Sequence, residues 1–302
     1  MVPPAAFFPS LITYHLFPLH APLTLYVVDA PFGRFSRLTS KWNLPGNAAW
    51  AGMELVAPVT LIATLCSASR PPLSPPARVL AGLYLTHYLH RAVVSPLLLS
   101  PKRSPLHVTI PLAAAVFNLI NAYLLAIGLA FYAPTRLSWR FWLGVTGWAA
   151  GFVGNVYHDE ILNDLRRPKG KRLVLADLPE DDDPKAGRYK IPRGGLFRYV
   201  SFPNYLCEWL EWTSFALAAS PYPLIPVPSL EALHLKPGLA KTASSIIAGV
   251  WWPSALLAPP WMFVLAEITS MLPRAMSGHK WYQEKFGDKY PSSRTAVIPG
   301  IL

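Results

Sequence analysis

A carboxylic acid stands alone inside an apolar run of the sequence. Glu54 lies within residues 48–66, where nearly every neighbour is hydrophobic. Removing a carboxylate from water favours its neutral or hydrogen-bonded form. A protonated glutamic acid can donate a hydrogen bond to a ketone oxygen, so Glu54 is a candidate for polarising a carbonyl group. The alternative is a hydrogen bond between two packed helices.

A second group of polar residues lies in the next apolar run, residues 78–99. His87, Tyr88, His90 and Arg91 follow one another closely there. A tyrosine hydroxyl beside a carboxylic acid is a suitable pair of donors for a ketone oxygen, so we expect Tyr88 to work with Glu54. The two histidines do not make a metal site by themselves, and no further histidine motif follows, so we predict no metal. Packing between helices is the alternative role.

A third group lies where another apolar run ends in a dense polar segment. Asn155, Asp159 and Arg166 are spaced roughly by helical turns. Arginine can hold a phosphate through two hydrogen bonds, and asparagine can bind an amide or a ribose. These residues therefore suit an anionic nucleotide, although the interfacial end of a membrane helix is an alternative.

A fourth group extends from Tyr189 to Glu208. Gly194 and Gly195 permit close approach of the backbone. Asn204 and Glu208 are four positions apart, which places them on one face of a helix. The sequence has neither GxGxxG nor a P-loop, which excludes the usual soluble dinucleotide-binding folds.

The composition indicates which elements must position these groups. The chain has 302 residues, of which 52% are hydrophobic and 14% are charged, against roughly 25% charged residues in soluble domains. We therefore predict one all-α integral membrane domain, residues 1–302, with about seven transmembrane helices. Apolar stretches of bilayer-spanning length occur at 8–29, 48–66, 78–99, 108–132, 140–158, 199–219 and 245–272. Glycines at 144, 147, 151 and 154 have the spacing of small residues at a helix–helix interface.

The net charge of +11 does not indicate a nucleic-acid partner, because the basic residues lie in loops between apolar runs. They concentrate on one set of alternating loops. The positive-inside rule then places the N-terminus outside the cytosol and makes the loop 159–198 and the tail 273–302 cytosolic. Two cysteines, Cys66 and Cys207, form no recognisable disulfide or metal motif.

The four groups, taken in order, resemble the steroid 5α-reductase family, also called 3-oxo-5α-steroid 4-dehydrogenases. The resemblance begins at Pro31-Phe32-Gly33-Arg34, continues through the groups above, and ends in His279-Lys280-Trp281-Tyr282 and Tyr290–Arg294. It covers most of the chain. The His-Tyr-x-His-Arg form is more similar to the steroid branch than to the polyprenol or enoyl-CoA reductase branches.

This resemblance implies a seven-helix fold in the endoplasmic reticulum membrane, enclosing a cavity for NADPH and a steroid-like lipid. Hydride would pass to C5 of a 3-oxo-Δ4-steroid, and C4 would be protonated. The resemblance assigns Glu54 and Tyr88 to the ketone oxygen. It assigns the cofactor to Asn155, Asp159, Arg166, Tyr189, Asn204, Glu208, His279 and Tyr282, with Arg91 and Arg103 as further phosphate partners. Membrane lipids are the other expected partners, and no obligate protein partner is expected.

The sequence also departs from the family pattern. Phe32 replaces a tyrosine, Phe202 and Pro203 replace a Gly-Ala pair, and Cys207 replaces a glycine. The added bulk leaves open another substrate on the same fold, such as a polyprenal, an enoyl thioester or a polycyclic secondary metabolite. Two other classes stay open as well: an isoprenylcysteine-type methyltransferase that uses S-adenosylmethionine, and a non-catalytic transporter or scaffold.

Overall fold

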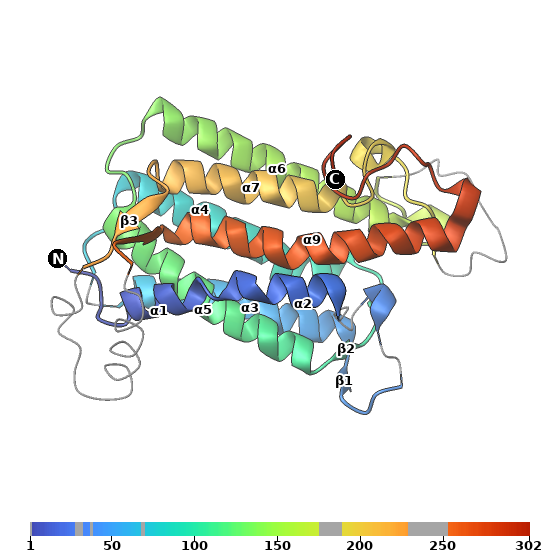
Figure 1. Ribbon diagram of the computed structural model, residues 1–302, viewed down its shortest axis with the longest axis horizontal. Coiled ribbons are helices and arrows are strands. Elements are labelled where there is room, and N and C mark those ends of the chain that lie inside the picture. The colour runs from blue at the N-terminus through green and yellow to red at the C-terminus, as the bar shows by residue number, and fades with distance from the viewer. Residues whose placement is uncertain (1, 28–32, 37–38, 68–69, 175–188, 229–252) are drawn as a thin grey trace.

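The computed structural model describes residues 2–27, 33–36, 39–67, 70–174, 189–228 and 253–302. Long helices run side by side along one axis, with the N-terminus at one end of the bundle (Figure 1). The main helices are α1 (Phe7–Tyr14), α2 (Ala21–Tyr26), α3 (Gly46–Leu65), α4 (Pro75–Leu89), α5 (Thr109–Tyr132), α6 (Trp139–Asp164), α7 (Pro203–Ala219) and α9 (Pro259–Phe286). The prediction of a helical fold is therefore confirmed for the described residues.

Short elements connect these helices. Two antiparallel strand pairs join β1 (Asn43–Leu44) to β2 (Leu106–His107) and β3 (Leu224–Pro226) to β4 (Ala255–Leu257). Single turns of 3-10 helix form η1 (Phe17–His20), η2 (Gly33–Phe35), η4 (Lys169–Lys171), η5 (Gly195–Arg198) and η7 (Gly287–Lys289).

The helices follow the predicted apolar stretches, but several boundaries differ. The loop expected to begin at 159 starts as helix, because α6 continues to Asp164. The tail expected from 273 is also helical at first, since α9 passes through Pro273 and ends at Phe286. The polar end of α6 stays helical because its carboxylates find buried partners: Arg167 lies 2.7 Å from Glu160 and 2.6 Å from Asp164.

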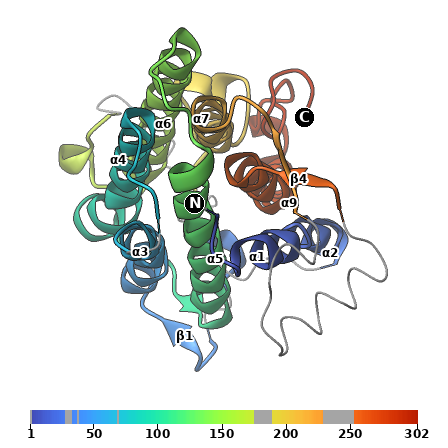
Figure 2. The same cartoon turned by 90° about the vertical axis from the view of Figure 1, so that its left-hand side faces the viewer.

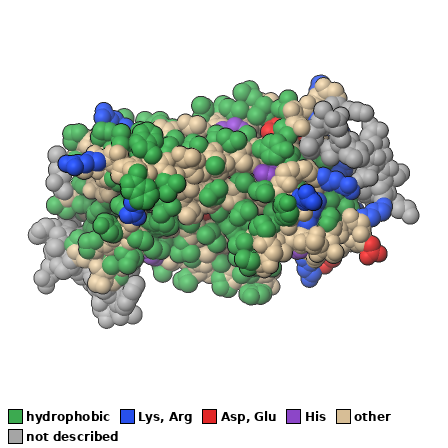
Figure 3. Space-filling view, turned by 90° about the horizontal axis from the view of Figure 1, so that it is seen from above, with side chains coloured by type: hydrophobic (Ala, Val, Ile, Leu, Met, Phe, Trp, Pro, Cys, Tyr) green, Lys and Arg blue, Asp and Glu red, His purple; other side chains and the backbone are tan. Residues whose placement is uncertain are grey.

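The surface of the bundle is apolar over its middle. Two of the described helices, α3 and α5, are long and apolar enough to cross a membrane. They expose Val59, Leu112 and Val116 among other large hydrophobic residues. Figure 3 shows hydrophobic side chains covering the middle of one face, with Lys and Arg mainly toward its two ends. An apolar surface of this kind fits contact with lipid.

The winding of the helix changes within the group of His87, Tyr88, His90 and Arg91, because α4 ends at Leu89. Ser74 caps the start of α4 by accepting a hydrogen bond from the amide of Ala77. The chain then continues as a π-helix, η3 (His90–Leu99), which ends where the Ser100 amide donates to the carbonyl oxygen of Ser95. Segments of π-helix are rare and frequent at functional sites.

The glycines of α6 allow α7 to approach very closely. A β-carbon at Gly151 would lie 2.5 Å from the backbone nitrogen of Glu211, and one at Gly144 would lie 2.7 Å from the carbonyl oxygen of Ser214. The predicted packing role of these glycines is confirmed. Seen along the bundle, α6 and α7 lie together, and α5 lies between α3 and α1 (Figure 2).

Candidate active site

A cavity of about 500 Å³ opens between α3, α4, η3, α5, α7 and α9, with η1 and α2 closing one side. Its volume suits a small-molecule ligand. Large apolar side chains form much of its wall, among them Phe117, Trp212 and Phe263. The polar groups in this wall are Glu54, His87, Tyr88, Arg91, Arg103, Asn118, Asp159, Asn204, Glu208, Glu267, Ser270 and Arg274, with His20 and Thr24 at the side formed by η1 and α2.

Arg91 holds two carboxyl groups of the cavity at once. Its Nε donates to Glu54 Oε1 at 3.0 Å, and its Nη1 lies 3.2 Å from Glu208 Oε1. The ring of Trp50 covers the guanidinium at 5.6 Å. Both glutamates are buried, where a charge without a partner is costly. The ion pairs with Arg91 offset this cost.

Glu54 and Tyr88 meet at Asn118, a residue of α5 that our sequence prediction did not include. The Tyr88 hydroxyl donates to Asn118 Oδ1 at 3.5 Å, and Asn118 Nδ2 lies 3.5 Å from Glu54 Oε2. A shorter bond, 2.8 Å, from Asn118 Nδ2 to the carbonyl oxygen of Met53 fixes the amide. The expected pair is thus brought together in the cavity wall from two different helices.

His87 turns away from this pair toward α7. Its Nδ1 lies 2.7 Å from Glu211 Oε1, and both side chains are buried. The ring also packs edge-on against Trp212, with 4.7 Å between the ring centroids. These contacts fix α4 against α7 beside the cavity, so the interhelical role considered for the histidine is the one observed.

A chain of amide and carboxyl groups joins α6 to α7. Asn155 Nδ2 donates to the carbonyl oxygen of Asn204 at 3.0 Å and to Glu208 Oε2 at 3.1 Å. Asn204 Nδ2 in turn donates to Asp159 Oδ1 at 3.0 Å. The buried Asn204 Oδ1 has no hydrogen-bond partner among the described residues. Asn155 and Asp159 of the third group and Asn204 and Glu208 of the fourth therefore form one polar wall.

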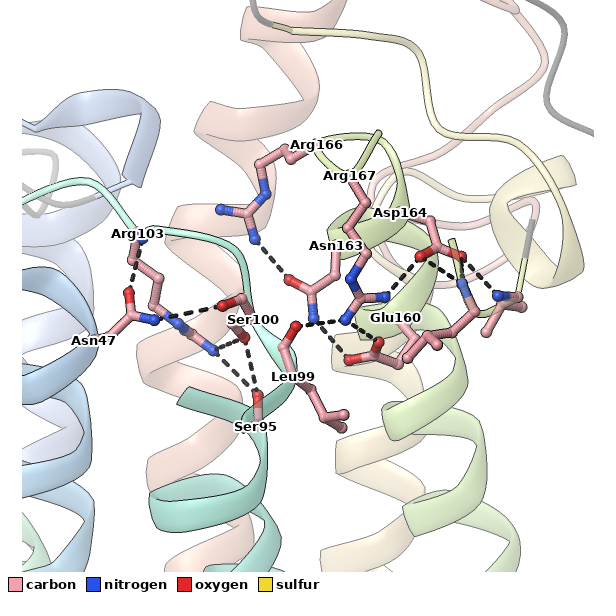
Figure 4. A network of polar contacts seen from close by, with 12 residues as sticks. Asn47, Ser95, Leu99, Ser100, Arg103, Glu160, Asn163, Asp164, Arg166 and Arg167 are labelled. Atoms are coloured by element: carbon pink, nitrogen blue, oxygen red, sulfur yellow. Dashed lines mark hydrogen bonds and ion pairs between the residues drawn. The ribbon is translucent and has the colours of Figure 1, made fainter. Parts of the chain in front are cut away.

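Arg103 and Arg166 approach the same region from different segments (Figure 4). Arg103 donates to the hydroxyl groups of Ser95 and Ser100 at 3.1 and 2.9 Å, and Arg166 donates to Asn163 Oδ1 at 2.6 Å. Burial is the main cause that lowers the pKa of Arg103 to about 10, and the positive charge of Arg166 contributes to this decrease. Arg103 remains a cation at neutral pH. An anion placed beside it would offset the repulsion between the charges of Arg103 and Arg166.

A second network fastens the segment after α6. Arg167 binds the carboxylates of Glu160 and Asp164 and donates to the carbonyl oxygen of Leu99 at 2.5 Å (Figure 4). Asp164 also accepts hydrogen bonds from the amides of Leu173 and Val174. These bonds hold the end of η3 against the end of α6, and so they support the segment between Leu99 and Arg103.

Tyr189, His279 and Tyr282 do not line the cavity. They lie in a separate cluster, where Ser201 Oγ is 2.6 Å from both His279 Nδ1 and the Tyr290 hydroxyl. Burial lowers the pKa of His279, and the positive charge of Arg294 lowers it further, so this imidazole is neutral at neutral pH. The Tyr189 ring packs edge-on against Trp281, with centroids 5.0 Å apart.

Arg34 connects this cluster to the N-terminal part of the chain. Its guanidinium lies 4.3 Å from the ring centroid of Tyr282 and 4.8 Å from that of Trp281, and it donates to the carbonyl oxygen of Gly278. Such cation–π contacts favour a fixed position of the arginine. The segment that contains Gly33 and Arg34 is thereby tied to the end of α9.

The polar end of the cavity suits an anionic dinucleotide. Arg91, Arg103 and Arg274 all line the cavity, which gives it several cations for phosphate groups. The buried Nε of Arg103 and Oδ1 of Asn204 have no hydrogen-bond partner within the described part of the chain. A bound nucleotide would supply an acceptor for the first and a donor for the second.

The departures from the family pattern have distinct structural positions. Phe202 packs against Gly278, so closely that a β-carbon at Gly278 would lie 2.3 Å from the Phe202 ring. Cys207 packs against Gly154. Pro203 begins α7. None of these three lines the cavity, so the bulk expected to change the pocket instead lies in helix contacts. Phe32 lies outside the described residues.

Comparison with known proteins gives a consistent result. A family model described as 3-oxo-5-alpha-steroid 4-dehydrogenase matches residues 104–226 and 246–302. An uncharacterized protein of Schizosaccharomyces pombe is 38% identical over 93% of this chain and 94% of its own length. The 3-oxo-5-alpha-steroid 4-dehydrogenase 1 of Rattus norvegicus is 32% identical over 91% of this chain and 87% of its own length. A steroid 5-alpha-reductase of Solanum lycopersicum is 30% identical over 89% of this chain and 87% of its own length. The chain belongs to the steroid 5α-reductase family.

Proposed function

We propose that this protein is a membrane-embedded oxidoreductase that uses NADPH to reduce the C4=C5 double bond of a 3-oxo-Δ4-steroid or a similar sterol-like enone. Hydride adds to C5 and a proton adds to C4, which leaves the saturated 3-ketone and NADP+. Family membership supports the reaction class. The observation that carries the proposal is the convergence of Glu54 and Tyr88 on Asn118 inside a largely apolar cavity.

Glu54 and Tyr88 act on the ketone oxygen. Electron density moves toward this oxygen as the hydride reaches C5, so hydrogen-bond donors that meet it stabilise the transition state more than the ground state. The Tyr88 hydroxyl is one donor, and a protonated Glu54 is the other. Because the Tyr88–Asn118 bond is long, 3.5 Å, the hydroxyl can exchange it for a substrate oxygen at little cost.

The residues around Arg103 hold the cofactor. NADPH, when bound, supplies the hydride. Arg91 and Arg103 bind its anionic groups, with Arg166 beside them, and Asp159, Asn204 and Glu208 hold its neutral polar groups together with Asn155. Tyr282 and His279 position the polypeptide outside the cavity, because they bind Arg34 and Ser201. Tyr189 packs against Trp281, the neighbour of Tyr282.

The membrane arrangement is part of the same proposal. Seven spans cross the endoplasmic reticulum membrane, with the N-terminus in the lumen and the C-terminus in the cytosol. The apolar middle of the surface supports the embedding in a membrane (Figure 3). The excess of basic residues in one set of alternating loops supports the orientation. NADPH then enters from the cytosolic end, whereas the lipid substrate comes from the bilayer.

Consumption of NADPH by the purified protein in lipid tests the proposal, with progesterone or testosterone as substrate. We expect a product two hydrogens heavier, formed with one equivalent of NADP+. Binding of NADPH without reduction of any steroid would move the substrate to another lipid enone, such as a polyprenal. Failure to bind NADPH would overturn the proposed function.

A further inference from the structure

Glu267 is a carboxyl group of the cavity that the proposed reaction does not use. It lies on α9 within the run Val264–Ile268, where its neighbours are otherwise hydrophobic. It shares one face of α9 with Phe263, Ser270 and Arg274, and all four line the cavity. An ionisable group at this depth is costly, which makes a ligand-binding role the first hypothesis.

Glu267 differs from the other carboxyl groups in the cavity wall by its lack of a partner. Glu54 and Glu208 both bind Arg91. Asp159 accepts a hydrogen bond from Asn204. Within the described part of the chain, no hydrogen bond or ion pair reaches the Glu267 carboxyl group. Its neighbour Ser270 already donates to the carbonyl oxygen of Ala266 at 2.7 Å, so this hydroxyl does not satisfy it.

The position of Glu267 is also informative. Glu54 and Tyr88 come from α3 and α4, and α9 lies across the bundle from these helices (Figure 2). A rigid ring system whose ketone meets Glu54 and Tyr88 therefore presents another part of its skeleton to α9. A polar group in that part of the substrate would meet Glu267 in otherwise apolar surroundings.

We propose that Glu267 is a specificity-determining residue that accepts a hydrogen bond from a hydroxyl group of the substrate, so that the preferred substrate is a hydroxylated 3-oxo-Δ4 ring system. A hydroxyl group satisfies both forms of the side chain, because the carboxylate and the carbonyl oxygen of the acid both accept hydrogen bonds. A second ketone would satisfy only the protonated form. A substrate with no polar group there would leave the carboxyl group unpaired, and sites built for a hydroxyl discriminate strongly against such analogues.

This inference rests on the proposed function, and the test separates the two. Progesterone, which has no hydroxyl group, is compared with its 11β-, 17α- and 21-hydroxylated derivatives. We expect the unmodified protein to reduce at least one derivative with a kcat/KM roughly 10- to 100-fold above that of progesterone. Glu267→Leu should abolish this preference, whereas Glu267→Gln, which keeps an acceptor oxygen, should retain most of it. Glu284→Gln, on an exposed part of α9, is the matched control.

Two outcomes overturn the inference while the proposed function stands: no derivative is preferred, or the preference is the same in Glu267→Leu. The dissociation constants of the same steroids give a second readout, followed by quenching of tryptophan fluorescence, since Trp50 and Trp212 line the cavity. If none of the steroids is reduced, the proposed function fails by itself. The ratio of dissociation constants in the unmodified protein and in Glu267→Leu then still decides the role of Glu267.

Discussion

The guanidinium of Arg91 lies 3.0 Å from the carboxylate of Glu54, the residue that we assign to the ketone oxygen. Arg91 is therefore the counter-ion of the proposed catalytic acid as well as of Glu208, 3.2 Å away. A ligand that takes a hydrogen bond from Glu54 must share this carboxyl group with Arg91. The hydrogen bonds that Arg91 gives to Glu54 thus depend on how the arginine divides its donors between the two glutamates.

We expect Glu54→Gln and Tyr88→Phe each to lower kcat by roughly 10²- to 10³-fold, the range found when one donor to a developing oxyanion is removed. The KM for NADPH should change less than kcat, because neither side chain is itself assigned to the cofactor; the effect should be smallest in Tyr88→Phe, since Glu54 binds Arg91. Single-turnover rates and NADPH titration of each variant measure the two effects. Tyr123→Phe removes a hydroxyl group from α5 outside the cavity, and equal loss there would contradict the assignment.

Asn118 is expected to act as a positioning residue for Glu54 and Tyr88. Asn118→Ala and Asn121→Ala are a matched pair, since both side chains are buried on α5. Within the described residues, the side chain of Asn121 accepts a hydrogen bond from Tyr14 and makes no hydrogen bond to Glu54 or Tyr88. Each change should lower the free energy of unfolding by about 1–3 kcal/mol. Only Asn118→Ala should lower kcat per folded molecule. Equal kcat in the two variants would assign Asn118 to stability alone.

Arg91→Met should destabilise the protein more than Arg91→Lys. The methionine leaves two buried carboxyl groups without a cation, and breaking buried pairs in this way typically costs about 3–5 kcal/mol. Thermal unfolding in lipid shows which of the two variants has the lower Tm, and we expect this to be Arg91→Met. Adding Glu208→Gln to Arg91→Met should recover part of the lost Tm, whereas adding Glu284→Gln, from the exposed pair with Lys280, should not.

Arg103→Gln and Arg166→Gln should each raise the dissociation constant of NADPH by about tenfold or more, because each removes a cation from the proposed phosphate site. Arg140→Gln, at the opposite end of α6, is the matched control and should leave NADPH affinity unchanged. The effects of the two site variants should shrink as salt is added. An identical dissociation constant in all three variants would place the phosphates elsewhere.

Gly151→Ala should lower both Tm and activity, because the added methyl group would lie 2.5 Å from the backbone of α7, which carries Asn204 and Glu208. Gly82→Ala makes the same chemical change on the exposed side of α4, where no other atom lies within 4 Å. It should raise the free energy of unfolding by up to about 1 kcal/mol through helix propensity. The difference in Tm between the two variants separates the effect of the α6–α7 contact from the effect that a glycine-to-alanine change has on any helix.

Hydropathy predicted where helices lie better than where they end. The apolar stretches at 48–66 and 108–132 became α3 and α5 nearly unchanged. The stretch at 8–29 became three short helices, and Pro18 lies in the first turn of the 3-10 helix η1. The stretch at 245–272 began too early, since α9 starts at Pro259, and residues 245–252 lie outside the described part of the chain. Local composition cannot show that Glu160 and Asp164 stay helical because Arg167 pairs with them.

The candidate site was predicted in part for the same physical reason. Glu54 and Tyr88 were identifiable because polar groups in apolar runs are costly. Asn118 and Glu267 also stand in apolar runs and carry the same signal. What the sequence did not contain was direction: nothing in it shows that His87 faces Glu211, or that His279 and Tyr282 join a cluster outside the cavity.

The close contact between α6 and α7 has a mechanical consequence. At Gly144 and Gly151 the two backbones leave no room even for a methyl group, so these helices cannot slide past one another without a clash. The two helices therefore behave as one rigid unit, and this unit carries Asn155, Asp159, Asn204 and Glu208. Any widening that admits a bulky ligand must therefore come from the helices that face α6 and α7 across the cavity.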